Sequence, residues 1–209
     1  MFLVFEGVEG SGKSTQARLL AEWLTGAGIA HVLTREPGGT QVGEEIRRAL
    51  LHGGDVPVRT ELLLMVAARA AFVEQVVRPA LARGDVVIAD RYELSSFAYQ
   101  GYGRGLALED VRRVNAFATG GVRPDLTILL DVEPQEGAAR RQRAGAAADR
   151  IESAGVDFHR AVAGAYRLLS ETEKDVAVVA GDASPEAVHA RIRGLLRDRF
   201  PETFPPAEG

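Results

Sequence analysis

The sequence has no cysteine in its 209 residues, which excludes disulfide bonds and any zinc or nucleophile site built from cysteine. Aromatic residues make up only 6% of the chain, and no apolar run approaches the roughly 18 residues of a membrane span. Acidic residues outnumber basic ones, and the net charge of −4 argues against a general nucleic-acid-binding surface. No signal peptide is expected, because a strand pattern starts within two residues of Met1. These absences favour a cytoplasmic enzyme that binds neither membranes nor nucleic acid.

Five short segments have the continuous Val, Ile and Leu content of strands that are buried on both faces of a parallel sheet. They lie at 2–5, 31–36, 85–92, 125–132 and 175–182. Helical patterns separate them, at 14–27, 41–51, 59–83, 93–101, 107–119, 135–142, 152–173 and 184–199. The sequence therefore predicts one α/β domain over residues 1–209, with a five-stranded parallel sheet flanked by helices on both faces.

Two local features qualify this pattern. Pro79 lies inside the longest predicted helix and is expected to kink or end it. The C-terminal segment PETFPPAEG, residues 201–209, is expected to be a frayed tail.

Residues 7–15, GVEGSGKST, match the P-loop pattern G-x-x-x-x-G-K-[ST] between a strand and a helix. The glycines let backbone N–H groups approach an anion closely, and the following helix directs its dipole at the same point. Lys13 is expected to reach the β- and γ-phosphates of a nucleotide, and Ser14 to offer its hydroxyl to Mg²⁺. The expected ATP-binding residues in this loop are Gly7, Glu9, Gly10, Ser11, Gly12, Lys13, Ser14 and Thr15.

Polar residues follow every predicted strand, at the sheet edge where ligands bind in this fold class. Asp90 ends the third strand as a Walker-B carboxylate does, which makes it a candidate Mg²⁺ ligand; a helix cap is the alternative. Arg91 offers a planar guanidinium suited to a phosphate, and a solvent-facing arginine is the alternative. Other strands are followed by Glu9, Lys13, Arg35, Glu36, Asp131 and Asp182.

Three further features carry charge or irregular backbone. TREPGGT at 34–40 predicts an irregular loop around Pro37, and a plain turn is the alternative. Arg69 lies in an apolar helical stretch, so it either pairs with Glu61, Glu74 or Asp90 or faces a ligand. RRQRAGAAADR at 140–150 has little to pack with and predicts a mobile lid near 140–152, or else a solvated helix end. Its arginines are Arg140, Arg141, Arg143 and Arg150.

Taken together, these motifs resemble the thymidylate kinase family over nearly the whole chain. The resemblance rests on GVEGSGKST, TREPGGT, AAR in the long helix, DRYELSSFAYQGYGRG, RPDLTILLDV and DRIE. It implies a P-loop nucleoside monophosphate kinase fold that transfers the γ-phosphate of ATP to dTMP, giving dTDP for dTTP synthesis. It also implies Mg²⁺ as cofactor and a homodimer.

The resemblance assigns roles at the acceptor site. Arg35 and Arg91 would bind the dTMP phosphate, and Arg69 would contact thymine O4. Tyr99 would crowd the 2′ position of the sugar, and Glu9 would meet the 3′-OH or help to position the acceptor phosphate. A cis peptide bond is expected between Glu36 and Pro37. The implied dTMP-binding set is Glu9, Arg35, Pro37, Met65, Arg69, Arg91, Ser96, Tyr99 and Gln100, with Ser14 and Asp90 as metal candidates.

The loop has no basic residue between Gly7 and Gly12, so the resemblance implies catalytic arginines in the lid, as in the bacterial group. Arg143 and Arg150 are the first choices among them, and they join Lys13 and Arg91 as the expected catalytic residues. Arg140 and Asp182, the latter in the purine-edge loop VAGDAS, are expected beside ATP.

Met65 stands where the family usually has a phenylalanine that stacks on thymine, so weaker base discrimination is expected, since methionine gives up aromatic stacking. Phe72, further along the helix, is an alternative source of the ring.

Three alternative functions stay open. They are a P-loop kinase for another deoxynucleotide or nucleoside acceptor, a nucleotide-binding switch, and a catalytically weak paralogue. The segment DRYELSSFAYQG disfavours the first, and the lack of an N-K-x-D motif disfavours the second.

Overall fold

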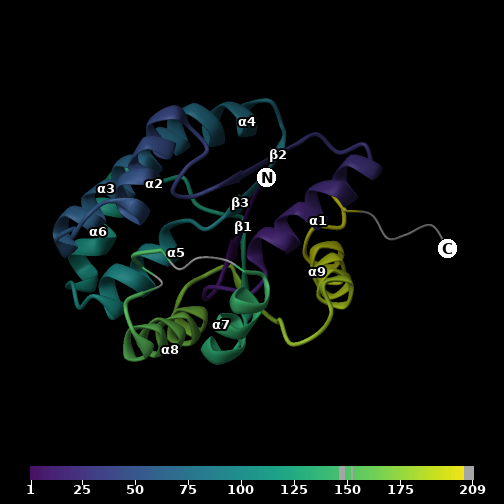
Figure 1. Cartoon of the computed structure of the whole chain (residues 1–209). Coiled ribbons are helices and arrows are strands. Elements are labelled where there is room, and N and C mark those ends of the chain that lie inside the picture. Colours follow the sequence, from purple (N-terminus) through teal and green to yellow (C-terminus); the bar gives the residue numbers. More distant parts are fainter. Residues whose placement is uncertain (146–148, 152, 205–209) are drawn as a thin grey trace.

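The computed structural model describes residues 1–145, 149–151 and 153–204 (Figure 1). Within these residues, five strands form one parallel sheet, as the sequence predicts, and the strand order is β2-β3-β1-β4-β5. The strands are β1 Phe2–Glu6, β2 His31–Arg35, β3 Val86–Asp90, β4 Leu126–Asp131 and β5 Val176–Ala180. No helix in the described part of the chain combines the length and apolar character needed to cross a membrane.

The helices fall close to their predicted positions. They are α1 Lys13–Gly26, α2 Gln41–His52, α3 Val58–Phe72, α4 Arg78–Ala82, α5 Glu93–Ser96, α6 Leu108–Thr119, α7 Pro134–Arg143, α8 Val156–Thr172 and α9 Pro185–Arg199. Two segments are π-helical: η1 Val73–Val77 and η2 Phe97–Gly103.

Alternate residues of the sheet face two different sets of helices. In β1, Leu3 and Phe5 join a core that includes Leu20 of α1 and Ile192 of α9. Phe2 and Val4 pack on the other face of the sheet, against η1 and α4. Figure 1 shows α1 and α9 on one side of the sheet and the α2, α3 and α6 helices on the other. Because successive side chains of a strand point to opposite faces, an all-apolar strand can fill both cores.

The helix that contains Pro79 does not end at that residue, although an end there was one of the two expected outcomes. It continues from α3 through η1 into α4, and Pro79 stands in the first turn of α4. Proline cannot donate a hydrogen bond to the preceding turn. The wider π-helical turn at Val73–Val77 directly precedes α4, and such turns accommodate an interrupted ladder of helical hydrogen bonds.

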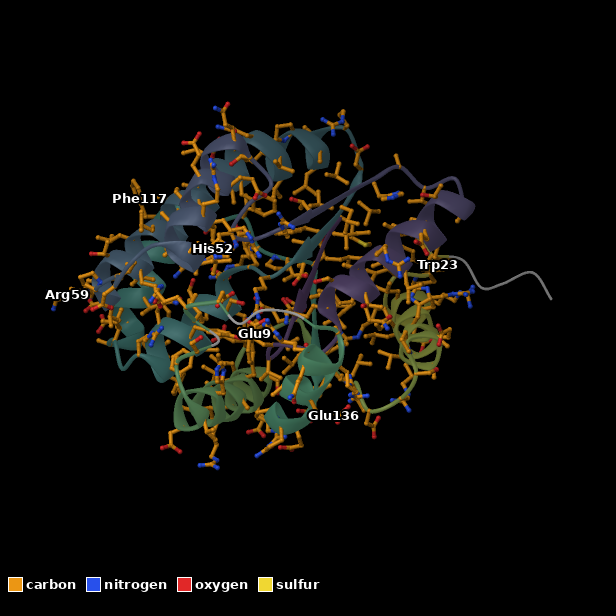
Figure 2. All side chains as sticks on the ribbon, viewed as in Figure 1. Glu9, Trp23, His52, Arg59, Phe117 and Glu136 are labelled. Carbon is orange, nitrogen blue, oxygen red and sulfur yellow. The ribbon has the colours of Figure 1, made fainter. Side chains whose placement is uncertain are left out.

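The C-terminal segment corrects the expectation of a frayed tail. Phe204 is fully buried, and its ring stacks on Trp23 with centroids 5.5 Å apart. Figure 2 shows Trp23 beside α9, where this aromatic contact closes the core on the α1 side. Only residues 205–209 of the predicted tail lie outside the described part of the structure.

We expect Phe204→Ala to lower the free energy of unfolding by about 3–5 kcal/mol, because it leaves a cavity against Trp23. Urea unfolding followed by circular dichroism measures the change. Leu168→Ala, at a side chain that is 44% exposed, is the control and should cost less than about 1 kcal/mol. Equal costs for the two variants would mean that Phe204 does not belong to the core.

Candidate active site

The P-loop lies between β1 and α1 and has the close backbone contacts that its glycines predict. Gly7 and Gly10 have φ angles of 140° and 73°, which disfavour other residues. A Cβ atom on Gly10 would lie 2.1 Å from the carbonyl oxygen of Gly137 in α7. The loop is therefore packed directly against the first half of α7.

Lys13 is buried and curls back over the loop. Its Nζ donates to the carbonyl oxygens of Gly7 at 3.1 Å and Val8 at 2.8 Å. Burial, together with the positive charge of Arg91, lowers the pKa of Lys13 to about 8. The ammonium group is thus held at the loop by backbone carbonyl oxygens.

The start of α1 leaves its backbone N–H groups open. No side chain caps this end, where Gly12 is the N-cap residue. By contrast, Thr40 caps α2 and Ser184 caps α9 through their side-chain oxygens. An uncapped helix start inside a glycine loop is a site for an anion such as a phosphate.

A cleft of about 740 Å³ opens over the P-loop and α7. Seven basic side chains line it against four acidic ones, although the whole chain has a net charge of −4. The basic residues are Lys13, Arg35, Arg47, Arg91, Arg140, Arg141 and Arg143, and the acidic ones are Glu9, Glu36, Asp90 and Glu136. The cleft is suited to a polyanion of several phosphates.

The two metal candidates lie together in this cleft. The hydroxyl of Ser14 donates to the carboxylate of Asp90. Among the described residues, no group of three or more His, Cys, Asp or Glu side chains could hold a metal ion. A pair of oxygen ligands next to an anion site suits Mg²⁺, which keeps several waters and takes phosphate oxygens as its other ligands.

Arg91 lies at the carboxyl end of β3 and joins the P-loop to the helices beyond the sheet. It adopts a φ of 80°, which is uncommon for a residue with a side chain. Its Nη2 lies 2.6 Å from Oε1 of Glu9 and donates to the Tyr99 hydroxyl at 3.1 Å. Burial acts to raise the pKa of Glu9, but Arg91 and Lys13 outweigh it and lower that pKa to about 2. Glu9 is therefore ionised at neutral pH.

Glu6 is a supporting residue that the sequence analysis missed, because it reads as the end of a buried strand. It is fully buried, and its carboxylate accepts from the backbone N–H groups of Tyr92 and Ser95. The hydroxyls of Ser95 and Tyr166 also donate to it and in turn accept from Arg91. Glu6 thus fixes the groups that orient the Arg91 guanidinium.

A second, smaller cavity of about 110 Å³ adjoins the cleft. It gathers most of the residues that the resemblance assigns to the acceptor: Glu9, Pro37, Met65, Arg69, Arg91, Ser96, Tyr99 and Gln100. Arg47 of α2 lines it too and was not foreseen, since it reads as a surface residue of an amphipathic helix. Arg35 lines only the cleft, where it pairs with Glu44. The two cavities share Glu9, Glu36, Arg47 and Arg91.

Arg69 is buried and paired, but none of the three acids named from the sequence is its partner. Its Nε lies 2.7 Å from Oε2 of Glu36, which comes from the irregular loop after β2. The Nη atoms donate to Ser96, Asn115 and the carbonyl of Tyr92. These contacts use four of the five N–H groups and leave one on Nη2. The peptide bond before Pro37 in the same loop is cis, as expected.

Met65 faces the small cavity, whereas Phe72 does not. Phe72 is fully buried in the core with Tyr92, on the sheet face away from α1. The alternative that Phe72 supplies an aromatic ring to the site is therefore wrong, since its ring is already part of the fold.

The lid residues do not all lie in the cleft. Arg140 donates to the carbonyl of Gly181 at 2.9 Å, and Arg143 pairs with Glu136. Arg150 does not line the cleft, because its guanidinium is held 2.7 Å from Glu61. Residues 146–148 and 152 of the predicted lid lie outside the described residues.

Asp182 also lies outside the cleft lining in the described structure. Its carboxylate pairs with Arg191 at 3.3 Å, while its neighbours Gly181 and Ala183 line the cleft. The residues on either side of Asp182 therefore line the cleft, while Asp182 itself does not.

The parallel sheet, the P-loop and the two adjoining cavities define a phosphotransferase of the P-loop nucleoside monophosphate kinase type. The family model described as thymidylate kinase matches residues 5–192. A thymidylate kinase of Synechococcus sp. (strain JA-3-3Ab) is 48% identical over 98% of this chain and 99% of its own length. That of Desulforudis audaxviator is 46% identical over 95% and 93%.

A solved structure supports the same assignment. The crystal structure of thymidylate kinase from Ehrlichia chaffeensis superposes with a TM-score of 0.75 at 28% identity, covering 94% of this chain and 98% of that one. The chain belongs to the thymidylate kinase family.

The buried pair Arg69–Glu36 gives a testable consequence for stability. Arg69→Met should lower the free energy of unfolding by about 3–5 kcal/mol, because it leaves the Glu36 carboxylate buried without its partner. Combining it with Glu36→Gln should cost less than the sum of the two single changes, as measured by urea unfolding. Strictly additive costs would show that the two side chains do not interact.

Proposed function

We propose that this enzyme transfers the γ-phosphate of ATP to dTMP, giving dTDP for dTTP synthesis, with the cleft as donor site and the small cavity as acceptor site. The observation that carries the proposal is that the two cavities meet at Arg91 and Glu9. In that arrangement a phosphate bound beside Arg91 faces the P-loop. Family membership supports the same reaction.

The chemistry needs alignment and charge stabilisation more than proton transfer. A nucleoside monophosphate is already an oxyanion at neutral pH, so no general base is required. The N–H groups at the start of α1 and the Lys13 ammonium bind the donor phosphates. Arg91 screens the repulsion between the two anions and stabilises charge on the transferring group.

We place Mg²⁺ at Ser14 and Asp90. Their oxygens lie together at the P-loop, and a hydroxyl–carboxylate pair leaves room for water and phosphate ligands. When bound, the ion neutralises charge on the donor phosphates.

The lining of the small cavity supports most of the acceptor roles in this proposal. Arg91, with Arg35 at its outer side, binds the acceptor phosphate, and Glu9 and Tyr99 meet the sugar. Arg69, Ser96 and Gln100 read the base edge, while Met65 and Pro37 contact its ring. These roles are supported by the cavity lining and by the resemblance of the motifs.

The lid arginines complete the donor site in this proposal. Arg140 and Arg143 already lie at the cleft, and Arg150 joins the catalytic set only when the lid changes conformation. We further propose one domain over residues 1–209, with a mobile lid near 140–152. A cytoplasmic location stays a prediction from the sequence.

An ADP-release assay with ATP·Mg²⁺ tests the reaction, with dTMP, dUMP, dCMP, dGMP, AMP and thymidine as acceptors. We expect dTMP to be preferred and Lys13→Ala or Arg91→Ala to lower turnover at least about 100-fold with the fold intact. Met65→Phe should increase the preference for dTMP over dUMP, because stacking on the methylated ring improves. Equal ADP release without any acceptor would identify a nucleotide-hydrolysing protein instead.

We also propose that the chain forms a homodimer through the exposed face of α3 and α6. Phe117 on α6 is 91% exposed and Leu63 on α3 is 58% exposed, although the two helices pack together. Figure 2 shows Phe117 and Arg59 on the same outer side of the molecule, away from Glu9. Large apolar side chains exposed on neighbouring helices are typical of an interface.

Size-exclusion chromatography with light scattering tests this face. The wild type should have twice the 22.4 kDa chain mass, and Phe117→Glu should shift it to the monomer mass. Leu168→Glu, on α8, is the matched control and should remain dimeric. A wild-type monomer, or a dimer that survives Phe117→Glu, would contradict the proposed interface.

A further inference from the structure

Gln100 lies in η2 with its side-chain amide between the acceptor cavity and a buried carboxylate. It is 2% exposed and lines the small cavity. Its Nε2 donates to Oε1 of Glu61 at 2.9 Å. No described residue donates to its carbonyl oxygen Oε1, so the acceptor end of the amide is left for a ligand.

Glu61 is held in place as an acceptor. It is 1% exposed, and its carboxylate also accepts from Arg104 and, at 2.7 Å, from Arg150. Burial acts to raise the pKa of Glu61, but its bonds from Gln100, Arg150 and Arg104 outweigh that effect and lower the pKa. An ionised carboxylate offers no hydrogen, so only the NH₂ end of Gln100 can face it.

We propose that Glu61 is a positioning residue that fixes the Gln100 amide with its carbonyl Oε1 toward the acceptor cavity, where it accepts from the N3–H of a thymine or uracil base. Reversing the amide would direct two hydrogens at that position instead. Glu61 acts through Gln100 and does not itself line the cavity.

The hydrogen-bonding pattern of the cavity discriminates between pyrimidines. Arg69 has one N–H left on Nη2, which matches the O4 acceptor of thymine. Cytosine presents an amino group in place of O4 and an unprotonated N3 in place of N3–H. It would therefore place donor against donor at Arg69 and acceptor against acceptor at Gln100, and unpaired polar groups in a closed site are costly.

The lid segment contributes to the same carboxylate. Arg150 reaches Glu61 from the DRIE motif, and its Nε also donates to the carbonyl of Leu50 in α2. A carboxylate with three bonded neighbours has little freedom to rotate, so the orientation of Gln100 is set before a base arrives.

The test compares dTMP with dCMP as acceptor at saturating ATP·Mg²⁺. In Glu61→Gln, the Gln100 amide is no longer forced to direct its NH₂ end at residue 61, because a glutamine there can present either its oxygen or its own NH₂ group. We expect it to lower the ratio of kcat/KM for dTMP to that for dCMP about tenfold, while Arg69 maintains part of the preference. Arg104→Gln is the matched control: it removes one arginine but keeps the carboxylate, and the ratio should stay within about twofold.

The outcomes separate this inference from the proposed function on which it rests. A wild type that does not prefer dTMP overturns both. A wild type that prefers dTMP, with a ratio unchanged in Glu61→Gln despite lower rates for both acceptors, overturns the positioning role alone. A ratio that falls equally in Arg104→Gln also overturns it, because the effect would then come from losing an ion pair.

A measurement on the wild-type protein covers the case in which Glu61→Gln does not fold. The side-chain NH₂ signals of Gln100 are identified in a ¹⁵N-labelled sample by their loss in Gln100→Met. One proton should show the downfield shift of a bond to a carboxylate, and the shift should persist when dTMP binds. Signals of an unbonded amide, or loss of the downfield shift on adding dTMP, would overturn the assignment.

Discussion

The arrangement of the active site depends on the hydrogen bonds of one guanidinium, that of Arg91. Its contacts reach Glu9 and the Gly7 carbonyl in the P-loop, Tyr99 in η2 and Tyr166 in α8. These elements are distant in sequence, and each meets the carboxyl edge of the sheet from a different direction. The positive charge of Arg91 is compensated by the carboxylates of Glu9 and Glu6, and the surrounding hydroxyls accept further hydrogen bonds from it. The two cavities are therefore joined by a hydrogen-bond network that links the P-loop to η2 and α8.

The strands and the P-loop could be predicted because their signals are local: short Val- and Ile-rich segments for a buried sheet, and glycine spacing for a phosphate site. The π-helical turns η1 and η2 could not, since their sequences are compatible with ordinary helix and their geometry depends on packing. The partner of Arg69 was missed for a related reason. Glu36 is 33 positions away in the loop after β2, whereas the acids named from the sequence, Glu61, Glu74 and Asp90, follow or precede Arg69 at shorter separations. Phe204 was missed because its neighbours are proline and charged residues, while its contact with Trp23 spans almost the whole chain.

The electrostatics of the cleft show why whole-chain charge says little about ligands. Although the protein is acidic overall, seven basic side chains line the cleft. Most of them pair with a neighbouring carboxylate, which holds the side chain in one orientation. Lys13 differs from these because its hydrogen bonds go to backbone carbonyls and a hydroxyl instead of a carboxylate, and burial together with Arg91 lowers its pKa to about 8. The negative charge of a bound polyphosphate favours the protonated form of this lysine, so nucleotide affinity depends on the protonation of Lys13.

The close backbone contact between Gly10 and Gly137 makes the first half of α7 part of the phosphate loop. At a rise of about 1.5 Å per residue, the arginines at 140–143 extend about 5–9 Å beyond that contact along the helix axis. The positions of these guanidinium groups therefore depend on how closely the two backbones approach each other. A Cβ atom on Gly10 would lie 2.1 Å from the Gly137 carbonyl oxygen, and one on Gly137 would lie 2.2 Å from that of Glu9. Substituting either glycine would force loop and helix apart, and every arginine of α7 would be displaced with the helix.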